Sequence, residues 1–268
     1  MPFADLPRSP SAPGAGPARV HYRERGAGPA VLLLHGGWGH DVYPFDAQLE
    51  SLAPRFRAIA PDRVGYGRSG RVAALDDGFH LRMAEETFLL MDALGLREAA
   101  LWGHSDGAVV AAWMAILEPA RVRALVLEAF HFLRAKAASL DFFETGAAAP
   151  ERFGPAVAAG LEADHGAGWR EVVGHGARAW LRIIAAGRER GGDLYDGRLG
   201  EIGAPVLFLH GARDPRSEPG ELEAARRALP SARLALLDTG HSPHSGSAAA
   251  AATAAAVDFL ARACPPGA

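Results

Sequence analysis

The chain has 268 residues, with 28 Lys and Arg against 31 Asp and Glu and a formal net charge of −3. This length fits one domain, or one domain with an inserted subdomain, and the missing basic excess argues against nucleic acid as a partner. No apolar run approaches the roughly 20 residues that span a bilayer, so we expect no membrane partner. The single cysteine, Cys264, excludes an internal disulfide, and without a signal-peptide pattern we expect a cytoplasmic protein.

The chain begins with a segment rich in Pro, Gly, Ser and Ala, and we predict that residues 1–18 form a mobile N-terminal arm. From residue 19 onward, short apolar runs alternate with helix-length segments. Because several runs are apolar on both faces, this alternation predicts an α/β fold with a mostly parallel, doubly wound sheet. We predict strands at 20–24, 30–35, 55–61, 99–103, 124–129, 205–210 and 233–238, and helices at 44–53, 79–94, 107–117, 219–229 and 246–262.

The alternation stops between about residues 131 and 200, where helix-forming residues are interrupted by Gly and Pro and no strand pattern is present. We therefore predict a helical cap over residues 131–200, inserted into a core made of residues 19–130 and 201–263. Large apolar residues of this segment are expected to face the core or to hold the cap in place. They are Phe142, Phe143, Phe153, Trp169 and Trp180.

The strongest motif is the only G-x-S-x-G of the chain, at residues 103–107, between a predicted strand and a predicted helix. A sharp strand-to-helix turn strains its central residue and needs small neighbours, so that the serine protrudes at the edge of the sheet. Gly103 and Gly107 provide that room. The motif predicts Ser105 as a nucleophile.

A serine nucleophile needs a base, and the base needs an acid that orients it. Asp214 follows the predicted strand at 205–210 and His241 follows the strand at 233–238, at the edge where open α/β sheets gather functional groups. We predict His241 as the base and Asp214 as the acid. His244 is an alternative base, and Glu128, at the end of the strand at 124–129, is an alternative acid.

A glycine-rich loop, HGGWG, follows the strand at 30–35. Glycines let backbone N–H groups approach a ligand closely. We predict that the N–H groups of Gly37 or Trp38, together with that of Asp106 at a helix N-terminus, form an oxyanion hole. His35 is expected to fix this loop by hydrogen bonding.

Together these motifs resemble the α/β-hydrolase superfamily. HGGWG at 35–39, DRVGYGRS at 62–69, GHSDG at 103–107, HGARDP at 210–215 and GHSPH at 240–244 match its landmarks in order, over about residues 19–263. The resemblance implies an α/β-hydrolase fold, a cap over residues 131–200 and a triad of Ser105, His241 and Asp214. Serine at this turn differs from the dehalogenase and epoxide-hydrolase branches, which use a carboxylate nucleophile. The element Ser105-Asp106-Gly107 is similar to amino-acid-ester hydrolases of the valacyclovirase type.

We therefore expect a hydrolase that cleaves a small ester, lactone or related acyl compound through an acyl-enzyme on Ser105. Its predicted pocket includes Asp106, Glu128, Trp169 and Trp180. Asp106 either attracts a positively charged substrate group or only stabilises the start of the helix at 107–117. A cofactor-free haloperoxidase or perhydrolase and a carbon–carbon bond hydrolase would use the same residues. Outside enzymes, the alternative is a small-molecule receptor with residual hydrolysis.

Two other patterns do not fit a cofactor or metal site. Residues 65–70 match G-x-G-x-x-G, but no helix follows directly to bind a pyrophosphate. His210, Asp214, His241 and His244 could form a metal cluster, but His241 and His244 are an H-x-x-H pattern on a loop, without the helical i, i+4 spacing of the zinc-protease pair. We therefore expect no cofactor and no metal.

Overall fold

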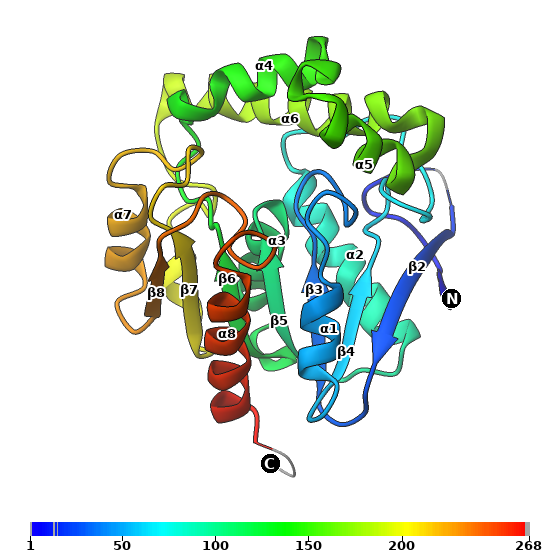
Figure 1. The fold of residues 1–268 in the computed structure, drawn as a ribbon, viewed down its shortest axis with the longest axis vertical. Coiled ribbons are helices and arrows are strands. Elements are labelled where there is room, and N and C mark those ends of the chain that lie inside the picture. The colour runs from blue at the N-terminus through cyan, green and yellow to red at the C-terminus, as the bar shows by residue number, and fades with distance from the viewer. Residues whose placement is uncertain (1, 13, 15, 266–268) are drawn as a thin grey trace.

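The computed structural model describes residues 2–12, 14 and 16–265. Within them an eight-stranded sheet runs in the order β1-β2-β4-β3-β5-β6-β7-β8 (Figure 1). β1 and β2 pair antiparallel with their neighbours, whereas β4, β3, β5, β6, β7 and β8 are parallel. This confirms the predicted mostly parallel α/β sheet. The strands are β1 (Phe3–Leu6), β2 (Ala18–Arg25), β3 (Ala30–Leu34), β4 (Arg57–Pro61), β5 (Ala99–His104), β6 (Val122–Glu128), β7 (Val206–Gly211) and β8 (Arg233–Leu237).

Helices cover both faces of the sheet, which explains the apolar runs of the strands. On β3, Val31 and Leu33 belong to the apolar cluster shared with α1 (Asp46–Leu52) and α8 (Ala249–Ala263). Leu32 and Leu34 belong to the cluster shared with α2 (Phe79–Ala93), α3 (Asp106–Leu117) and α7 (Glu221–Ala228). Each predicted core strand and helix is present, with ends shifted by three residues or fewer.

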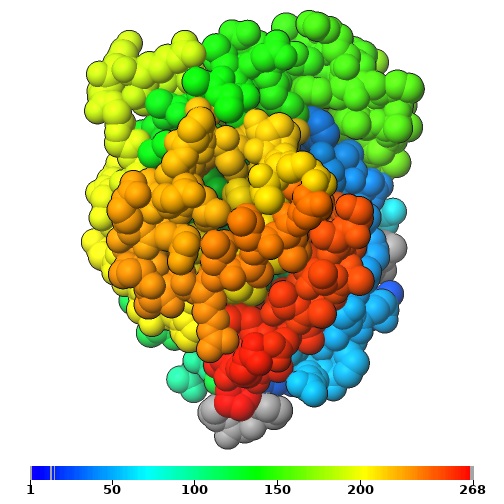
Figure 2. Space-filling view, turned by 60° about the vertical axis from the view of Figure 1, so that its left-hand side comes forward, coloured from blue at the N-terminus to red at the C-terminus, as the bar shows by residue number. Residues whose placement is uncertain are grey.

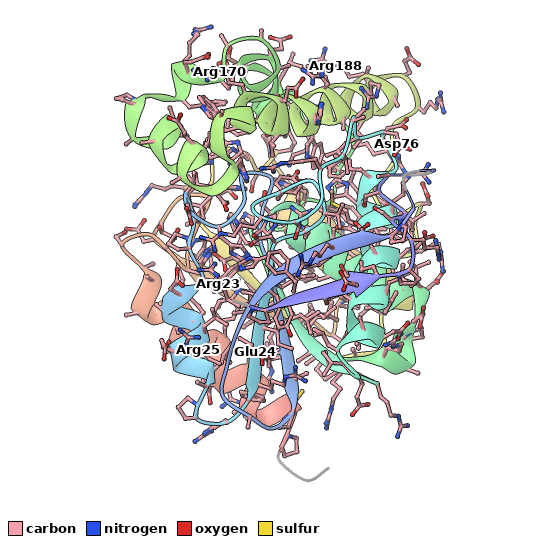
Figure 3. All side chains as sticks on the ribbon, turned by 90° about the vertical axis from the view of Figure 1, so that its right-hand side faces the viewer. Arg23, Glu24, Arg25, Asp76, Arg170 and Arg188 are labelled. Carbon is pink, nitrogen blue, oxygen red and sulfur yellow. The ribbon has the colours of Figure 1, made fainter. Side chains whose placement is uncertain are left out.

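A helical insertion, residues 131–200, lies between β6 and β7 and contains α4 (Leu140–Ala148), α5 (Pro155–His165) and α6 (Trp169–Arg190). Figure 1 shows these helices above the carboxyl ends of the strands, and in Figure 2 the insertion, in green, covers one end of the core. Arg170 and Arg188 stand on the outer side of α6 (Figure 3), whereas Trp180 and Ile184 are buried beneath it. No helix in the described part of the chain is long and apolar enough to cross a membrane.

The N-terminal segment differs from the expected mobile arm of residues 1–18. β1 pairs with β2, and Leu6 is buried against the core. The hydroxyls of Ser9 and Ser11 both donate to the carboxylate of Glu86, and the donor from Ser11 lies 2.7 Å away. The prediction of a mobile arm is therefore wrong for the described residues, because this segment gains a strand pairing and a buried polar anchor. Residues 1, 13 and 15 of the predicted arm lie outside the described part.

Candidate active site

Ser105 occupies a strained turn between β5 and α3, with φ of 54° and ψ of −120°. This left-handed conformation is costly for a residue with a Cβ atom and is typical of functional sites. A Cβ atom at Gly103 would lie 2.2 Å from the carbonyl oxygen of Gly107, and one at Gly107 would lie 2.0 Å from that of Leu34. Both flanking positions therefore require glycine.

The structure brings Ser105, His241 and Asp214 into one hydrogen-bonded chain. The Oγ atom of Ser105 lies 3.0 Å from Nε2 of His241, whose Nδ1 atom lies 2.9 Å from each carboxylate oxygen of Asp214. His241 belongs to the loop after β8 and Asp214 to the loop after β7, as the parallel order of the sheet requires. This geometry is what nucleophilic catalysis needs: a hydroxyl, a base and an acid that orients the base.

Burial and neighbouring charges set the protonation of this chain. Burial lowers the pKa of His241, and the guanidinium of Arg216 lowers it further, against the opposing effect of Asp214. Burial alone would raise the pKa of Asp214, but His241 and the backbone N–H of Arg216 outweigh it and hold that pKa well below its usual range. At neutral pH Asp214 is thus ionised and His241 is neutral, the form that accepts a proton from serine.

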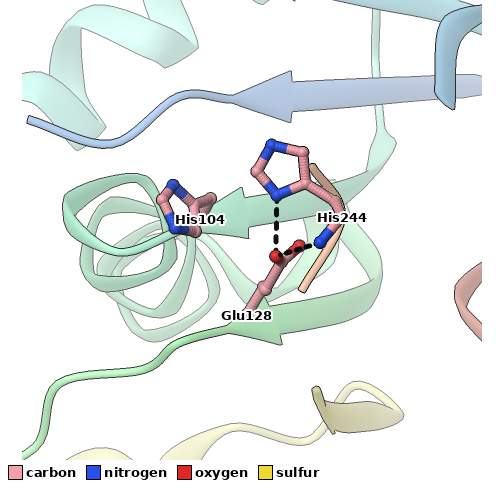
Figure 4. Close-up of side chains that lie close together, drawn as sticks. All are labelled: His104, Glu128 and His244. Carbon is pink, nitrogen blue, oxygen red and sulfur yellow. Dashed lines mark hydrogen bonds and ion pairs between the residues drawn. The ribbon is translucent and has the colours of Figure 1, made fainter. Parts of the chain in front are cut away.

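The two alternative residues, His244 and Glu128, bind each other instead of Ser105 (Figure 4). Oε1 of Glu128 accepts from Nδ1 of His244 at 2.7 Å and from its backbone N–H at 2.9 Å, while Oε2 accepts from Nε1 of Trp102 at 2.8 Å. This pair holds the loop that carries His241.

His104 stands beside this pair and completes a possible ligand set. One ligand atom from each of His104, Glu128 and His244 lies within 4.8 Å of the others. Both oxygens of Glu128 already accept N–H donors, and Nε2 of His104 lies 3.1 Å from the carbonyl of His241. A metal would therefore have to displace hydrogen bonds that support the elements next to Ser105. The donor set fits a polar anchor better than a metal centre.

The predicted oxyanion residues Gly37, Trp38 and Asp106 line one pocket together with Ser105. A Cβ atom at Gly37 would lie 2.7 Å from Oδ2 of Asp106, so the glycine-rich loop lies directly on the start of α3. His35 supports this loop, as predicted: its Nδ1 atom lies 2.7 Å from the carbonyl oxygen of Gly36. Two backbone segments thus meet beside Ser105, which is the arrangement that oxyanion stabilisation requires.

The pocket lies under the insertion, and two of the four predicted pocket residues line it. Asp106 and Trp180 do, whereas Glu128 is fully buried in its pair with His244, and Trp169 packs in the apolar cluster with Trp38. The pocket predictions for Glu128 and Trp169 are wrong because the first side chain pairs with His244 and the second packs in an apolar cluster. The lining residues are Gly36, Gly37, Trp38, Tyr43, His104, Ser105, Asp106, His131, Phe142, Phe143, Gly146, Val173, Gly176, Ala177, Trp180, Arg216 and His241.

Asp106 is engaged by side chains from two other elements. Its Oδ1 atom accepts hydrogen bonds from Nε1 of Trp180 at 2.9 Å and from Nε2 of His80 at 3.1 Å. Burial raises its pKa, but His80, Arg63 and Trp180 outweigh that effect, so the pKa is lowered and Asp106 is ionised. Asp106 therefore links the strand-to-helix turn at Ser105 to the insertion, because Trp180 belongs to α6.

Two further pocket residues have no counterpart among the predicted site residues. Nε2 of His131 lies 3.3 Å from Oγ of Ser105, and the rings of His131 and His241 stack with centroids 5.6 Å apart. Arg216 follows Asp214 by two residues and lines the same pocket. Their position in the chain could have indicated them. His131 comes just after the end of β6 and Arg216 just after the end of β7, at the same edge of the sheet as Asp214.

The α/β hydrolase fold family matches this chain over residues 29–171, which is more than half of its length. The chain is a hydrolase of the α/β-hydrolase fold family. It is 33% identical to the putative carbamate hydrolase RutD of Variovorax paradoxus over 92% of its own length and 98% of that protein. An epoxide hydrolase of Caballeronia sordidicola is 39% identical over 107 residues, but this match spans only 32% of that relative and 40% of this chain.

Solved structures of this family share the whole fold. An esterase from Thermogutta terrifontis superposes with a TM-score of 0.72 at 24% identity, over 98% of this chain and 99% of the esterase. A hydrolase from Pseudomonas aeruginosa superposes with a TM-score of 0.69 at 26% identity, over 93% of this chain and 96% of that chain. These likenesses establish the α/β-hydrolase architecture.

Proposed function

We propose that this protein is a serine hydrolase that cleaves a small ester, lactone or related acyl compound through an acyl-enzyme on Ser105. The observation that carries the proposal is the hydrogen-bonded chain in which Oγ of Ser105 lies 3.0 Å from His241, and His241 lies 2.9 Å from Asp214. In the first step His241 takes the hydroxyl proton while Oγ attacks the carbonyl carbon. Backbone N–H groups of the loop at Gly37 and of Asp106 then stabilise the oxyanion.

The first step ends when the bond from the carbonyl carbon to the alcohol oxygen breaks and His241 gives its proton to the leaving alcohol, so that the acyl group stays on Oγ. In the second step His241 accepts a proton from water, and the resulting hydroxide attacks the acyl-serine. The bond to Oγ then breaks, His241 returns the proton to Oγ, and the acid is released. Asp214 stays ionised and stabilises the imidazolium in both steps. The apolar walls of the pocket, including Phe142, Phe143 and Trp180, limit access of water and of long acyl chains.

Carbamate hydrolysis is a second candidate within the same mechanism. The relative that matches nearly the whole chain, from Variovorax paradoxus, is named a putative carbamate hydrolase. A carbamate is an acyl compound, so attack by Ser105 would follow the same course. The relatives named epoxide hydrolases match 40% to 43% of this chain, and serine at the turn differs from the carboxylate nucleophile of that branch.

A fluorophosphonate probe tests the nucleophile directly. We expect mass spectrometry to find the label on Ser105, and we expect Ser105→Ala to lower kcat by about 10⁴- to 10⁶-fold while the protein stays folded. A panel of short esters, lactones and carbamates then ranks the substrate classes. Short soluble esters should be turned over faster than emulsified long-chain lipid. Labelling at another serine would refute the assignment.

A further inference from the structure

Arg216 is the one arginine, and there is no lysine, among the described residues that line the pocket. It lies in the loop after β7, where its backbone N–H donates to Oδ1 of Asp214 at 2.9 Å. Its carbonyl oxygen accepts a hydrogen bond of 3.2 Å from the hydroxyl of Ser139 in the insertion. The main chain of Arg216 is therefore fixed from both sides, next to the acid of the proposed triad.

The guanidinium of Arg216 rests on aromatic rings rather than on an acid. Its Cζ atom lies 3.6 Å from the ring centre of Phe142 and 5.3 Å from that of Trp38. The side chain of Tyr43, which lines the same pocket, raises the pKa of Arg216 against the effect of burial. Stacking uses the flat face of a guanidinium and leaves its in-plane N–H groups available, because these point outward from its edge.

The charge of Arg216 has no carboxylate partner of its own. Among the described residues no aspartate or glutamate forms an ion pair with it, and Asp214 is bound through both oxygens to His241. Burial lowers the pKa of Arg216, and the nearby carboxylates of Asp214 and Asp106 offset this effect only in part, which indicates a cation that is partly removed from water. Asp106, the other charged residue of the pocket, differs because it accepts hydrogen bonds from Trp180 and His80.

We propose that Arg216 binds a carboxylate of the substrate, so that the preferred substrates are acyl compounds that carry a carboxylate close to the bond that is cleaved. This inference rests on the proposed function, since it takes Ser105 as the reacting group. A guanidinium donates two parallel hydrogen bonds to a carboxylate, and this interaction is stronger in a part-buried pocket than in water. A substrate with a positive charge at the same place would be repelled.

Paired esters that differ by one charge test this selectivity. Monomethyl glutarate against methyl pentanoate places the carboxylate on the acyl side, and 4-acetoxybenzoate against its methyl ester places it on the alcohol side. We expect wild type to favour the anionic member in at least one pair, measured as the ratio of kcat/KM values in a pH-stat. Arg216→Met should lower that ratio by about tenfold or more. Arg216→Lys, which keeps a point charge without the planar fork, should fall between the two.

Arg182→Met is the matched control. Arg182 is an exposed arginine that donates to the backbone carbonyl of Leu75 and does not line this pocket, so its removal should leave the ratio unchanged. An equal ratio in wild type and Arg216→Met for both ester pairs would overturn the proposal. So would a wild-type preference for the neutral ester in both pairs.

A binding measurement separates this proposal from the proposed function. Calorimetric titration of Ser105→Ala with monomethyl glutarate and 4-acetoxybenzoate needs no turnover. We expect the dissociation constant of the preferred ester to rise about tenfold or more when Arg216→Met is added to Ser105→Ala. Unchanged binding would refute the role of Arg216 even if Ser105 is the nucleophile. Loss of binding together with an unlabelled Ser105 would refute only the serine mechanism.

Discussion

Replacement of Glu128 by glutamine should destabilise the fold strongly, although the two side chains have the same size. The carboxylate is fully buried and accepts two N–H donors from His244 on Oε1 and one from Trp102 on Oε2. The glutamine amide keeps one acceptor oxygen, but an NH₂ donor replaces the second oxygen and would face an N–H group. Loss of a buried charged acceptor, with a donor left unpaired, costs about 3–5 kcal/mol. At this chain length the melting temperature should fall by roughly 6–20 °C.

Thermal unfolding of wild type and Glu128→Gln, followed by circular dichroism, measures this loss. Glu50→Gln is the control, because Glu50 belongs to an exposed pair with Arg25 and should shift the melting temperature by less than about 2 °C. A fall of less than about 3 °C for Glu128→Gln would refute the reasoning, since a buried carboxylate with three donors would then contribute no more than a surface charge.

The pH dependence of the same difference gives a second check. Burial raises the pKa of Glu128, but the charge and hydrogen bonds of His244 outweigh it, so the folded-state pKa lies below the ordinary value of 4.5. A lowered folded pKa gives stabilisation that is complete above the unfolded value and is lost as pH falls through the folded value. The gap between wild type and Glu128→Gln should therefore be constant from about pH 6 to 8 and shrink below about pH 4.5. A gap that widens in acid would contradict the assignment.

Three further predictions concern turnover. Burial and a nearby guanidinium lower the pKa of His241, so kcat/KM should rise with pH through a midpoint below 6.5, and a midpoint above 7 would contradict this. His131→Phe removes an atom 3.3 Å from the serine hydroxyl and should slow fluorophosphonate labelling by about tenfold, whereas an unchanged rate would leave His131 a packing residue. Gly37→Ala would place a methyl group 2.7 Å from Asp106 and should lower kcat/KM by at least about tenfold, while Gly240→Ala, which meets open space, should have little effect.

Apolar patterning was sufficient to predict the core. Runs such as 30–35 and 205–210 are apolar on both faces, and β3 and β7 do lie between two helical layers. Because parallel strands all end at one edge, chain order alone was enough to place Asp214 and His241 near Ser105. The same reasoning missed β1, because its four residues are too few to show a clear alternation of apolar and polar side chains before the Pro- and Gly-rich stretch. Its anchor, the hydrogen bonds of Ser9 and Ser11 to Glu86, joins residues 75 and 77 positions apart.

The errors in the predicted pocket have the same physical origin. Glu128 stands at the end of β6 as predicted, yet its partner His244 lies 116 residues away and draws the carboxylate out of the pocket. The one lysine of the chain, Lys136, is likewise fully buried in an ion pair with Glu221. The periodicity of apolar residues predicts which side chains are buried away from water. The position of a buried polar side chain depends instead on its hydrogen-bond partner, and that partner cannot be identified from a local sequence pattern.

The partners of buried polar groups also bear on the charge of the substrate that the pocket would prefer. From the sequence, Asp106 beside the nucleophile either attracts a positively charged substrate group or only stabilises the start of its helix. In the structure two N–H donors compensate that carboxylate, while Arg216, two residues beyond Asp214, stacks on Phe142 without an acidic partner. An ion in a pocket selects substrates only to the extent that the protein leaves it uncompensated. The sign of the selectivity therefore follows from the hydrogen bonds around each charge, and for this reason we propose an anionic substrate.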